Sequence, residues 1–411
     1  MDTVIFEWVN LLLRWTHVIA GMAWIGASFY FMHIDAHLQP VEDIPAGKGG
    51  EAWEVHGGGF YQVRKFLVAP ARMPEQLLWH KWQAYTTWLS GVALLVWLYY
   101  FSAELFLIDP AIKQLSPFSA AAIGIGALIG GWVVYDSLCR SALAKNDLLL
   151  LGVLFLFVVA AAYAFQNVFS GRGALIHTGA LMATMMAGNV GLLIIPNQRK
   201  VVDDLIAGRA PDPALGKLAK QRSAHNNYLT LPVVFLMLAN HYPLTYQNPW
   251  SFGIVALVLV AGALIRFFYN MRHQGKGDHW WAWAVAAIAI LGAIFLSVPA
   301  SPEARAQLGM KPLPERIYAK GTAAAPDKVT QIVQSHCAMC HAQTPSWPGI
   351  GIAPKGVLLD TAEAIERMRP EIGRIATQNH AMPPNNLTGL SPEDRAILAA
   401  WVADGPRPAT N

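Results

Sequence analysis

Runs of about twenty apolar residues recur along the first 300 residues of the chain, separated by polar or charged segments. A helical run of this length matches the hydrocarbon thickness of a bilayer. The sixth run is the shortest, and without it the chain would have seven spans and a different topology. The pattern predicts eight membrane-spanning helices, at residues 10–33, 82–103, 117–136, 148–167, 175–195, 228–243, 251–269 and 280–299.

Lysine and arginine are distributed unevenly between these spans. Four connecting loops each carry two to six basic residues, whereas the segments that alternate with them carry one at most. Cytoplasmic loops are enriched in Lys and Arg, so the N-terminus and the segment after the last span are predicted to lie outside. The predicted location is the bacterial inner (cell) membrane, crossed several times. The basic loops are 34–81, 137–147, 196–227 and 270–279.

Composition agrees with a membrane location. The chain is 54% hydrophobic, only 14% charged, and contains 15 tryptophans, which is too apolar for a soluble protein of 411 residues. The net charge of +4 mostly reflects the basic loops and requires no nucleic-acid partner. Residues 300–325 are rich in Ala, Pro and charge, so they are predicted to form a linker. The predicted organisation is therefore a membrane domain at 1–299, the linker, and a periplasmic domain at 326–411.

The five residues Cys337-Ala338-Met339-Cys340-His341 carry the most specific chemistry in the chain. Cys-x-x-Cys-His is the attachment signature of c-type haem. Cys337 and Cys340 would form thioethers to the haem vinyl groups, and His341 would ligate the iron. A thioredoxin-type pair would need a βαβ context, and a zinc site would need a second Cys or His pair at short spacing. Neither feature is present in the sequence after the motif. Haem is normally attached outside the inner membrane, in agreement with the charge pattern.

The sixth iron ligand is predicted to be Met382. His/Met ligation is common in cytochromes c. Met339 lies inside the attachment loop and Met368 lies in a charged helical pattern, whereas Met382 precedes two prolines that keep its segment extended. His380 is the rival, and ligation by two histidines would lower the potential. The methionine loop and the helix predicted after Ser391 resemble a small class I cytochrome c over residues 326 to 408.

Ionisable residues inside a membrane domain are functional candidates by default. His17, His177 and His241 are predicted at similar depth near the outer face, where imidazoles could ligate a b-type haem or a metal. The alternative is interfacial histidines bonded to carbonyls or water. Arg14-Trp15-Thr16-His17 followed by Trp24-Ile25-Gly26 resembles the first helix of small membrane haem proteins. His17 and His177 are therefore the predicted residues of an intramembrane haem.

A second polar cluster is predicted on the cytoplasmic side. Some of its members must be helix caps or solvated loop ends, but His, Asn, Arg and Tyr are also the side chains that hold a planar, anionic, amide-rich substrate. The glycines of His56-Gly57-Gly58-Gly59-Phe60 permit close backbone approach or mobility. The cluster comprises His33, Asp35, His37, His80, Asp136, Arg140, His225, Asn226, Asn227, Tyr228, His273, Asp278 and His279.

The order of these features resembles the bacterial membrane-bound urate oxidase (urate hydroxylase) fused to a cytochrome c. The resemblance spans essentially the whole chain. It implies an all-α fold, with an eight-helix transmembrane bundle followed by a class I cytochrome c domain. The catalytic residues cannot be assigned from it. The resemblance rests on residues 13–17, 23–30, 79–82, 225–228 and 337–341.

The resemblance also implies the reaction. The family oxidises urate to 5-hydroxyisourate and passes electrons to its own haem c without releasing peroxide. The electrons would continue to a downstream cytochrome or a terminal oxidase. Two alternatives remain: an electron-transfer subunit for a separate dehydrogenase, and a transporter with an appended cytochrome. Residue patterns alone indicate only a membrane redox protein with one haem c.

Overall fold

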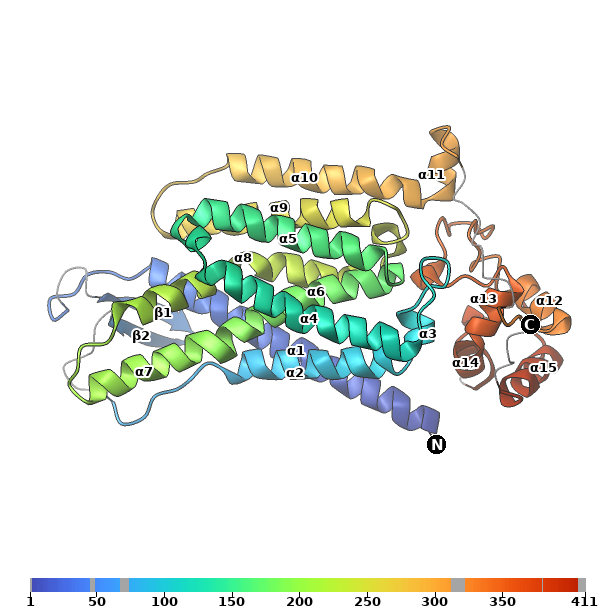
Figure 1. The fold of residues 1–411 in the computed structure, drawn as a ribbon, viewed down its shortest axis with the longest axis horizontal. Coiled ribbons are helices and arrows are strands. Elements are labelled where there is room, and N and C mark those ends of the chain that lie inside the picture. The colour runs from blue at the N-terminus through green and yellow to red at the C-terminus, as the bar shows by residue number, and fades with distance from the viewer. Residues whose placement is uncertain (1, 45–48, 67–73, 312–321, 379, 406–411) are drawn as a thin grey trace.

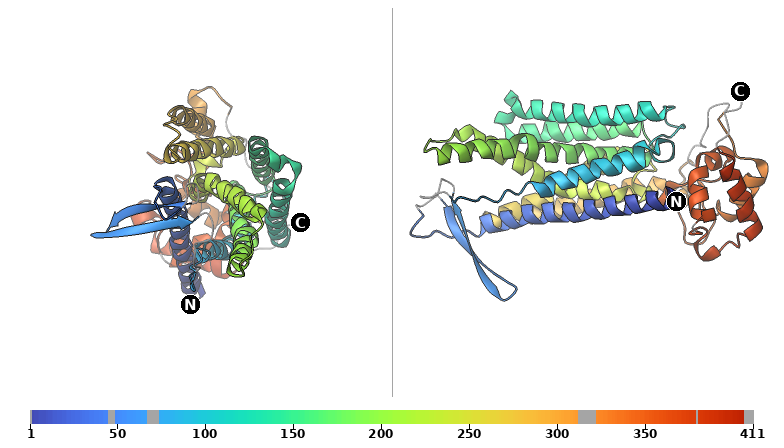
Figure 2. Two further views of the ribbon diagram at one scale, coloured as in Figure 1. Left: turned by 90° about the vertical axis from the view of Figure 1, so that its left-hand side faces the viewer. Right: turned by 90° about the horizontal axis from the view of Figure 1, so that it is seen from below.

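The computed structural model describes residues 2–44, 49–66, 74–311, 322–378 and 380–405. Long helices run side by side and form an elongated bundle (Figure 1). The C-terminal helices lie beyond one end of the bundle, and a β-hairpin lies at the opposite end (Figure 2). The chain is mostly helical, as predicted.

The bundle consists of helices that cover the predicted spans. Two helices change to π-helical geometry: α2 continues through Leu95–Tyr100, and α6 continues through Asn189–Ile194 into α7. Each of the eight predicted spans falls largely on helical residues, while the number of membrane crossings stays a prediction. The helices are α1 (Asp2–Ala36), α2 (Trp82–Leu94), α3 (Ala103–Phe106), α4 (Pro117–Arg140), α5 (Asp147–Gln166), α6 (Gly171–Gly188), α7 (Ile195–Ile206), α8 (Pro213–Ala239), α9 (Ser251–His273) and α10 (Trp281–Ser297).

Five helical segments among the described residues are long and apolar enough to cross a membrane. The apolar helix α10 is shorter than these five. A multi-pass membrane protein fits this finding. The five segments are Trp8–Ala36, Pro117–Arg140, Asp147–Gln166, Gly171–Ile206 and Ser251–His273.

Side-chain caps fix the starts of several bundle helices. The hydroxyl of Ser116 accepts a hydrogen bond from the backbone N–H of Ser119, and Pro117 occupies the first turn of α4. Asn146 and Ser170 cap α5 and α6 in the same way. A capping oxygen satisfies one of the backbone N–H groups that the first turn leaves without a partner.

The main apolar core lies between α4, α5, α6, α8 and α9. Small residues allow these helices to pack closely: a Cβ atom at Gly131 would come within 2.2 Å of Leu181 Cδ1. In the same way, a Cβ atom at Gly262 would lie 2.7 Å from Pro232 Cδ. Close approach through small residues is how helices associate inside a membrane, where burial from water gives no driving force.

A two-stranded antiparallel hairpin departs from the predicted all-α fold. Strands β1 (Gly49–His56) and β2 (Gly59–Phe66) pair so that His56 faces Gly59 across the turn. Gly57 and Gly58 both have positive φ, at 59° and 82°. A two-residue turn with both φ values positive suits the right-handed twist of paired strands. The glycine run therefore closes a hairpin.

The C-terminal region has an apolar core of its own, which includes Val333, Ile365, Leu398 and Trp401. Ser391 caps α15 by accepting a hydrogen bond from Asp394 N–H, and Pro392 occupies the first turn, as predicted. The helices here are α12 (Asp327–His336), α13 (Ala362–Arg367), α14 (Arg369–Ile372), followed by a π-helical turn Gly373–Gln378, and α15 (Pro392–Ala403), while the short α11 (Pro302–Gln307) lies at the end of α10 (Figure 1).

Candidate functional site

A cavity in the C-terminal region brings together the four residues predicted to hold haem c. Cys337, Cys340, His341 and Met382 all line this cavity, whose volume is about 430 Å³. Such a cavity, largely apolar with a few convergent polar groups, is typical of a cofactor site. The apolar side chains of its wall include Trp347, Ile350, Val357, Leu359, Ile372 and Leu387.

The attachment motif continues helix α12 as a turn. Cys337 N–H donates to Val333 O at 2.8 Å, and His341 N–H donates to Cys337 O at 2.9 Å. Burial raises the pKa of the Cys337 thiol to about 12 and also raises the pKa of the Cys340 thiol. Both side chains are therefore thiols at neutral pH, and an S–H group is what thioether formation consumes.

The ring of His341 is oriented as an iron ligand requires. Its Nδ1 lies 3.1 Å from Val357 O, so Nδ1 carries the proton and Nε2 keeps its lone pair. Burial lowers the pKa of His341, which favours the neutral imidazole. Histidines that ligate metals usually donate their other ring N–H in this manner. The donor set of this cavity therefore fits a haem.

Met382 is held by its backbone beside this cavity. Its N–H donates to Ile375 O at 2.9 Å, and Arg395 donates to its carbonyl at 3.1 Å. Among the described residues, His380 is not part of the cavity lining, whereas Met368 is. Met368 is only 4% exposed and packs in the apolar core. The geometry thus favours Met382 over His380.

The C-terminal region contacts the bundle next to this cavity. Arg367 Nη1 donates to Ile108 O at 3.5 Å, and Leu105 packs against the C-terminal core. A second cavity of about 760 Å³ lies at this contact, and Met368 is part of its wall and of the cysteine cavity's wall. The cysteine cavity is therefore adjacent to one end of the bundle.

A third cavity lies inside the bundle, in the half closest to the C-terminal helices. Its volume is about 300 Å³, and His17, His241 and Arg14 contribute its cationic or ligating groups. His17 Nδ1 lies 2.9 Å from Thr87 O, and His241 Nδ1 lies 3.2 Å from Leu238 O. Both rings thus keep Nε2 as an electron-pair donor.

His177 lies outside this third cavity. It is fully buried, with Nδ1 at 2.8 Å from Gly173 O and Nε2 at 3.2 Å from the hydroxyl of Tyr100. Both ring nitrogens therefore have hydrogen-bond partners within the bundle. The structure brings His17 together with His241, and it does not bring His17 together with His177.

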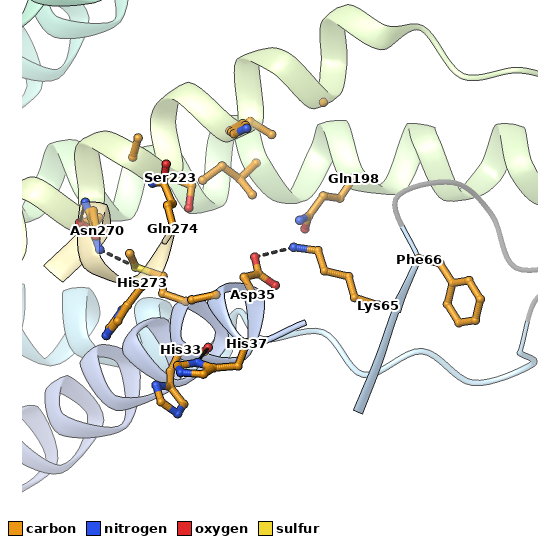
Figure 3. Close-up of a pocket in the computed structure, with 18 of the residues that line it drawn as sticks. His33, Asp35, His37, Lys65, Phe66, Gln198, Ser223, Asn270, His273 and Gln274 are labelled. Atoms are coloured by element: carbon orange, nitrogen blue, oxygen red, sulfur yellow. Dashed lines mark hydrogen bonds and ion pairs between the residues drawn. The ribbon is translucent and has the colours of Figure 1, made fainter. Parts of the chain in front are cut away.

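A cavity larger than these three lies at the opposite end of the bundle, close to the hairpin (Figure 3). Its volume is about 1790 Å³, and α1, α7, α8 and α9 contribute to its wall. His33, Asp35, His37 and His273 of the predicted cytoplasmic cluster all line it. Asn227 of the same cluster lines it too, together with Asn270, which is not among the predicted residues.

Three imidazoles meet in this large cavity. His33 lies in the last turn of α1 and His37 directly follows the helix, with ring centroids 4.2 Å apart. His273, from the end of α9, lies 5.8 Å from His33 and 6.2 Å from His37 by the same measure. His273 Nδ1 is buried and has no hydrogen-bond partner among the described residues. This nitrogen is therefore an unsatisfied polar atom on a residue that lines the cavity.

A buried cation stands behind the amides of the large cavity. Arg266 is 6% exposed, lies over the ring of Phe29 at 4.1 Å, and donates from Nε to Asn227 Oδ1 at 3.2 Å. Asn270 donates to the same oxygen at 3.1 Å. Within the described residues, the side-chain partners of Arg266 are the two amides, the sulfur of Met32 and the Phe29 ring, with no carboxylate among them. The amide groups of the wall are therefore fixed beside an uncompensated positive charge.

Other members of the predicted cluster form a buried network instead. Asn189, in the π-helical turn, donates to Tyr135 Oη at 2.8 Å and to Asn226 Oδ1 at 2.9 Å. The Tyr135 hydroxyl also lies 2.8 Å from His225 Nδ1. Arg222, with a fully buried side chain, pairs with Asp136 at 2.6 Å. These contacts join α4, α6 and α8 at the same end of the bundle.

Comparison with known proteins decides the family. The family model described as urate oxidase N-terminal matches residues 3–297. The chain belongs to the urate oxidase N-terminal family. The match covers the whole helical bundle and ends before the C-terminal helices, so a urate-related oxidoreductase function is assigned to the bundle. No curated protein and no solved structure matches the chain significantly.

Proposed function

We propose that this protein oxidises urate in the membrane and passes the electrons to a haem c bound by its own C-terminal domain. The observation that carries the proposal is the urate oxidase family match over residues 3–297. The cavity lined by the thiols, His341 and Met382 supports the second half of the proposal. Together they supply a urate-related domain and an electron acceptor in one chain.

The proposed reaction balances with water as the oxygen source. The urate anion loses two electrons and one proton, and the electrophilic ring then takes up water at C5 to give 5-hydroxyisourate. No oxygen molecule enters the product, and no peroxide forms at this step. A protein that performs it must bind a planar anion, accept a proton and remove two electrons.

The large cavity of Figure 3 suits the binding and proton transfer. Asn227 and Asn270 place side-chain amides in the cavity wall, where they bond to each other and to Arg266, and the buried cation favours an anionic purine. His273 is the proposed base because its Nδ1 is buried without a partner among the described residues. The rings of His33 and His37 lie 5.8 and 6.2 Å from the His273 ring by their centroids, so onward proton transfer would run through a bridging water.

The C-terminal cavity suits the electron acceptor. Cys337 and Cys340 would attach the haem, and His341 and Met382 would be its axial ligands. When bound, the haem accepts one electron at a time, so two transfers complete each turnover. We further propose that the C-terminal domain lies in the periplasm and delivers electrons to a downstream cytochrome or terminal oxidase, consistent with the distribution of basic loops.

Anaerobic mixing of the purified protein with urate tests the proposal. Urate alone should reduce the haem c, as followed by its visible absorption bands, and membranes in air should consume urate and oxygen without accumulating peroxide. An electron-transfer subunit of a separate dehydrogenase would leave the haem oxidised. A transporter would bind or move urate with no spectral change.

A variant of the proposed base locates the reaction. His273→Gln should slow haem reduction by urate by about 10²-fold or more, because general base catalysis typically contributes 10²–10⁴-fold. The matched control is His279→Gln, since His279 is at the same end of the bundle but lies outside the cavity lining. Stopped-flow absorbance measures both. Equal rates in the two variants would move the reaction away from this cavity.

A variant of the proposed axial ligand tests the haem assignment. Met382→His should lower the midpoint potential by about 0.1 V or more, because axial ligands tune haem over a range of about 0.8 V. Spectroelectrochemical titration measures the potential, and the weak far-red band of Met–iron ligation should disappear. Met368→Leu is the control, and a potential that follows Met368 instead would transfer the assignment to that residue.

A further inference from the structure

The third cavity combines two nitrogen donors with an apolar wall. His17 comes from α1, and His241 follows the end of α8, so the two donors come from separate segments of the bundle. The cavity wall contains no Asp, Glu or Cys. Its apolar members are Val18, Trp24, Trp88, Val92, Leu94, Leu95, Leu98, Tyr99, Leu128, Ile176, Met237 and Leu238, with small alanines and a glycine between them.

Local contacts prepare both histidines to bind a metal through Nε2. His17 Nδ1 is engaged by Thr87 O at 2.9 Å and lies 3.2 Å from Ser90 Oγ. His241 Nδ1 is engaged by Leu238 O at 3.2 Å. A backbone carbonyl on one ring nitrogen fixes the tautomer and raises the basicity of the other. His341 in the C-terminal cavity has the same arrangement.

Gly91 gives the His17 ring its space. A Cβ atom at position 91 would lie 2.9 Å from His17 Cε1, so any larger residue would displace the ring. In His177, by contrast, Nε2 itself is enclosed. A Cβ atom at Gly124 would lie 2.7 Å from this nitrogen, and the Tyr100 hydroxyl already lies within hydrogen-bond distance of it. The cavity thus has two available imidazoles.

Two imidazoles without a carboxylate or thiolate do not suit a bare metal ion. Structural and catalytic zinc sites use three or four protein ligands, and no group of three or more metal-binding side chains occurs among the described residues. A porphyrin supplies four nitrogens itself and needs only two axial ligands. Arg14, on the same wall, offers a cation to a propionate carboxylate.

We propose that His17 and His241 are the axial ligands of a b-type haem in this cavity. The volume of about 300 Å³ compares with about 430 Å³ in the cysteine cavity, and the adaptable side chain of Met237 is part of its wall. The site goes beyond the proposed urate reaction. It lies between the large cavity and the C-terminal domain, so electrons could pass through it one at a time.

The position along α1 supports a relay. His33 is sixteen residues from His17, which corresponds to about 24 Å along a helix axis. Trp24 lies between these two positions and lines the same cavity as His17. The C-terminal domain lies beyond the end of α1 that is further from His33 (Figure 2). A redox group beside His17 would divide the electron path from the large cavity to the C-terminal domain into two shorter transfers.

Pyridine haemochrome spectra of the purified full-length protein test the proposal without urate. We expect one b-type and one c-type haem per chain, with the near-infrared magnetic circular dichroism of bis-imidazole ligation in the b-type fraction. His17→Ala and His241→Ala should each lose the b-type haem and retain the covalent c-type haem. Retention of the c-type haem shows that the variant chain is made and that its C-terminal domain has matured, and the imidazole rescue below tests the bundle itself.

A control and a rescue keep the result decisive. His177→Gln should retain the b-type haem, because His177 lies outside the cavity. Added imidazole should restore haem binding to His241→Gly, which separates a ligand role from a structural one. Loss of haem b in His177→Gln with retention in His241→Ala would overturn the pairing. A native protein with only haem c, or with a quinone extracted from this cavity, would overturn the site itself.

Discussion

Replacement of both Cys337 and Cys340 by serine should reduce urate-dependent oxygen consumption by membranes to the background rate. These two thiols are the only attachment points of the proposed haem c, and serine hydroxyls do not form the thioethers. Without that haem, electrons taken from urate have no route out of the chain. An oxygen electrode measures the loss, and peroxidase staining of denaturing gels shows whether covalent haem is gone.

The same variant should still bind urate, since the large cavity lies at the other end of the bundle. Isothermal titration of the detergent-solubilised protein measures this binding. Cys139→Ser is the matched control, because Cys139 is the third cysteine of the chain and is buried near His225. Continued oxygen uptake in the double variant would refute the proposed exit route, and a surviving stained band would refute the attachment.

Asp136→Ala should lower the free energy of unfolding by about 3–5 kcal/mol, the typical cost of removing one partner from a buried ion pair. Asp136 pairs with Arg222 at 2.6 Å, and the side chain of Arg222 has no exposed surface. The variant would leave this guanidinium buried without its counter-charge. Thermal unfolding in detergent, followed by circular dichroism, should show a midpoint several degrees lower.

Asp204→Ala is the matched control for this stability measurement. Asp204 pairs with Arg209 at 2.7 Å, but the side chain of Arg209 is 64% exposed. Exposed pairs contribute only about 0–1 kcal/mol, so the midpoint should change little. The double variant Asp136→Ala, Arg222→Met should recover part of the loss, because the other partner of Asp136, Arg140, is exposed and no buried charge is then left unpaired. Equal midpoints for Asp136→Ala and Asp204→Ala would contradict this account.

The sequence predicted the helical elements well because hydrophobic periodicity is a local property. Each predicted span falls largely on helical residues, and the cap at Ser391 is confirmed. The hairpin was missed, although alternation around Gly57-Gly58 and the two-glycine turn are hairpin signals. The apolar spans on either side of this segment had suggested a simple connecting loop.

Tertiary packing explains what the sequence could not supply at the candidate sites. His33 and His37 are only four residues apart, but the approach of His273 depends on how α9 packs beside α1. The cavity shared by His17 and His241 likewise depends on Thr87 and Gly91 of α2. Arg266 and Asn270 lie in an apolar helical pattern that gave no local signal of a site.

The placement of the large cavity and the C-terminal domain at opposite ends of the bundle has an energetic consequence for the cell (Figure 1). Under the proposed orientation, each urate sends two electrons outward across the bilayer while its proton is released inside. An inside-negative membrane potential drives negative charge in that direction, by about 2.3 kcal/mol per charge for each 100 mV. Urate oxidation would then draw on the membrane potential, and dissipating that potential should slow it.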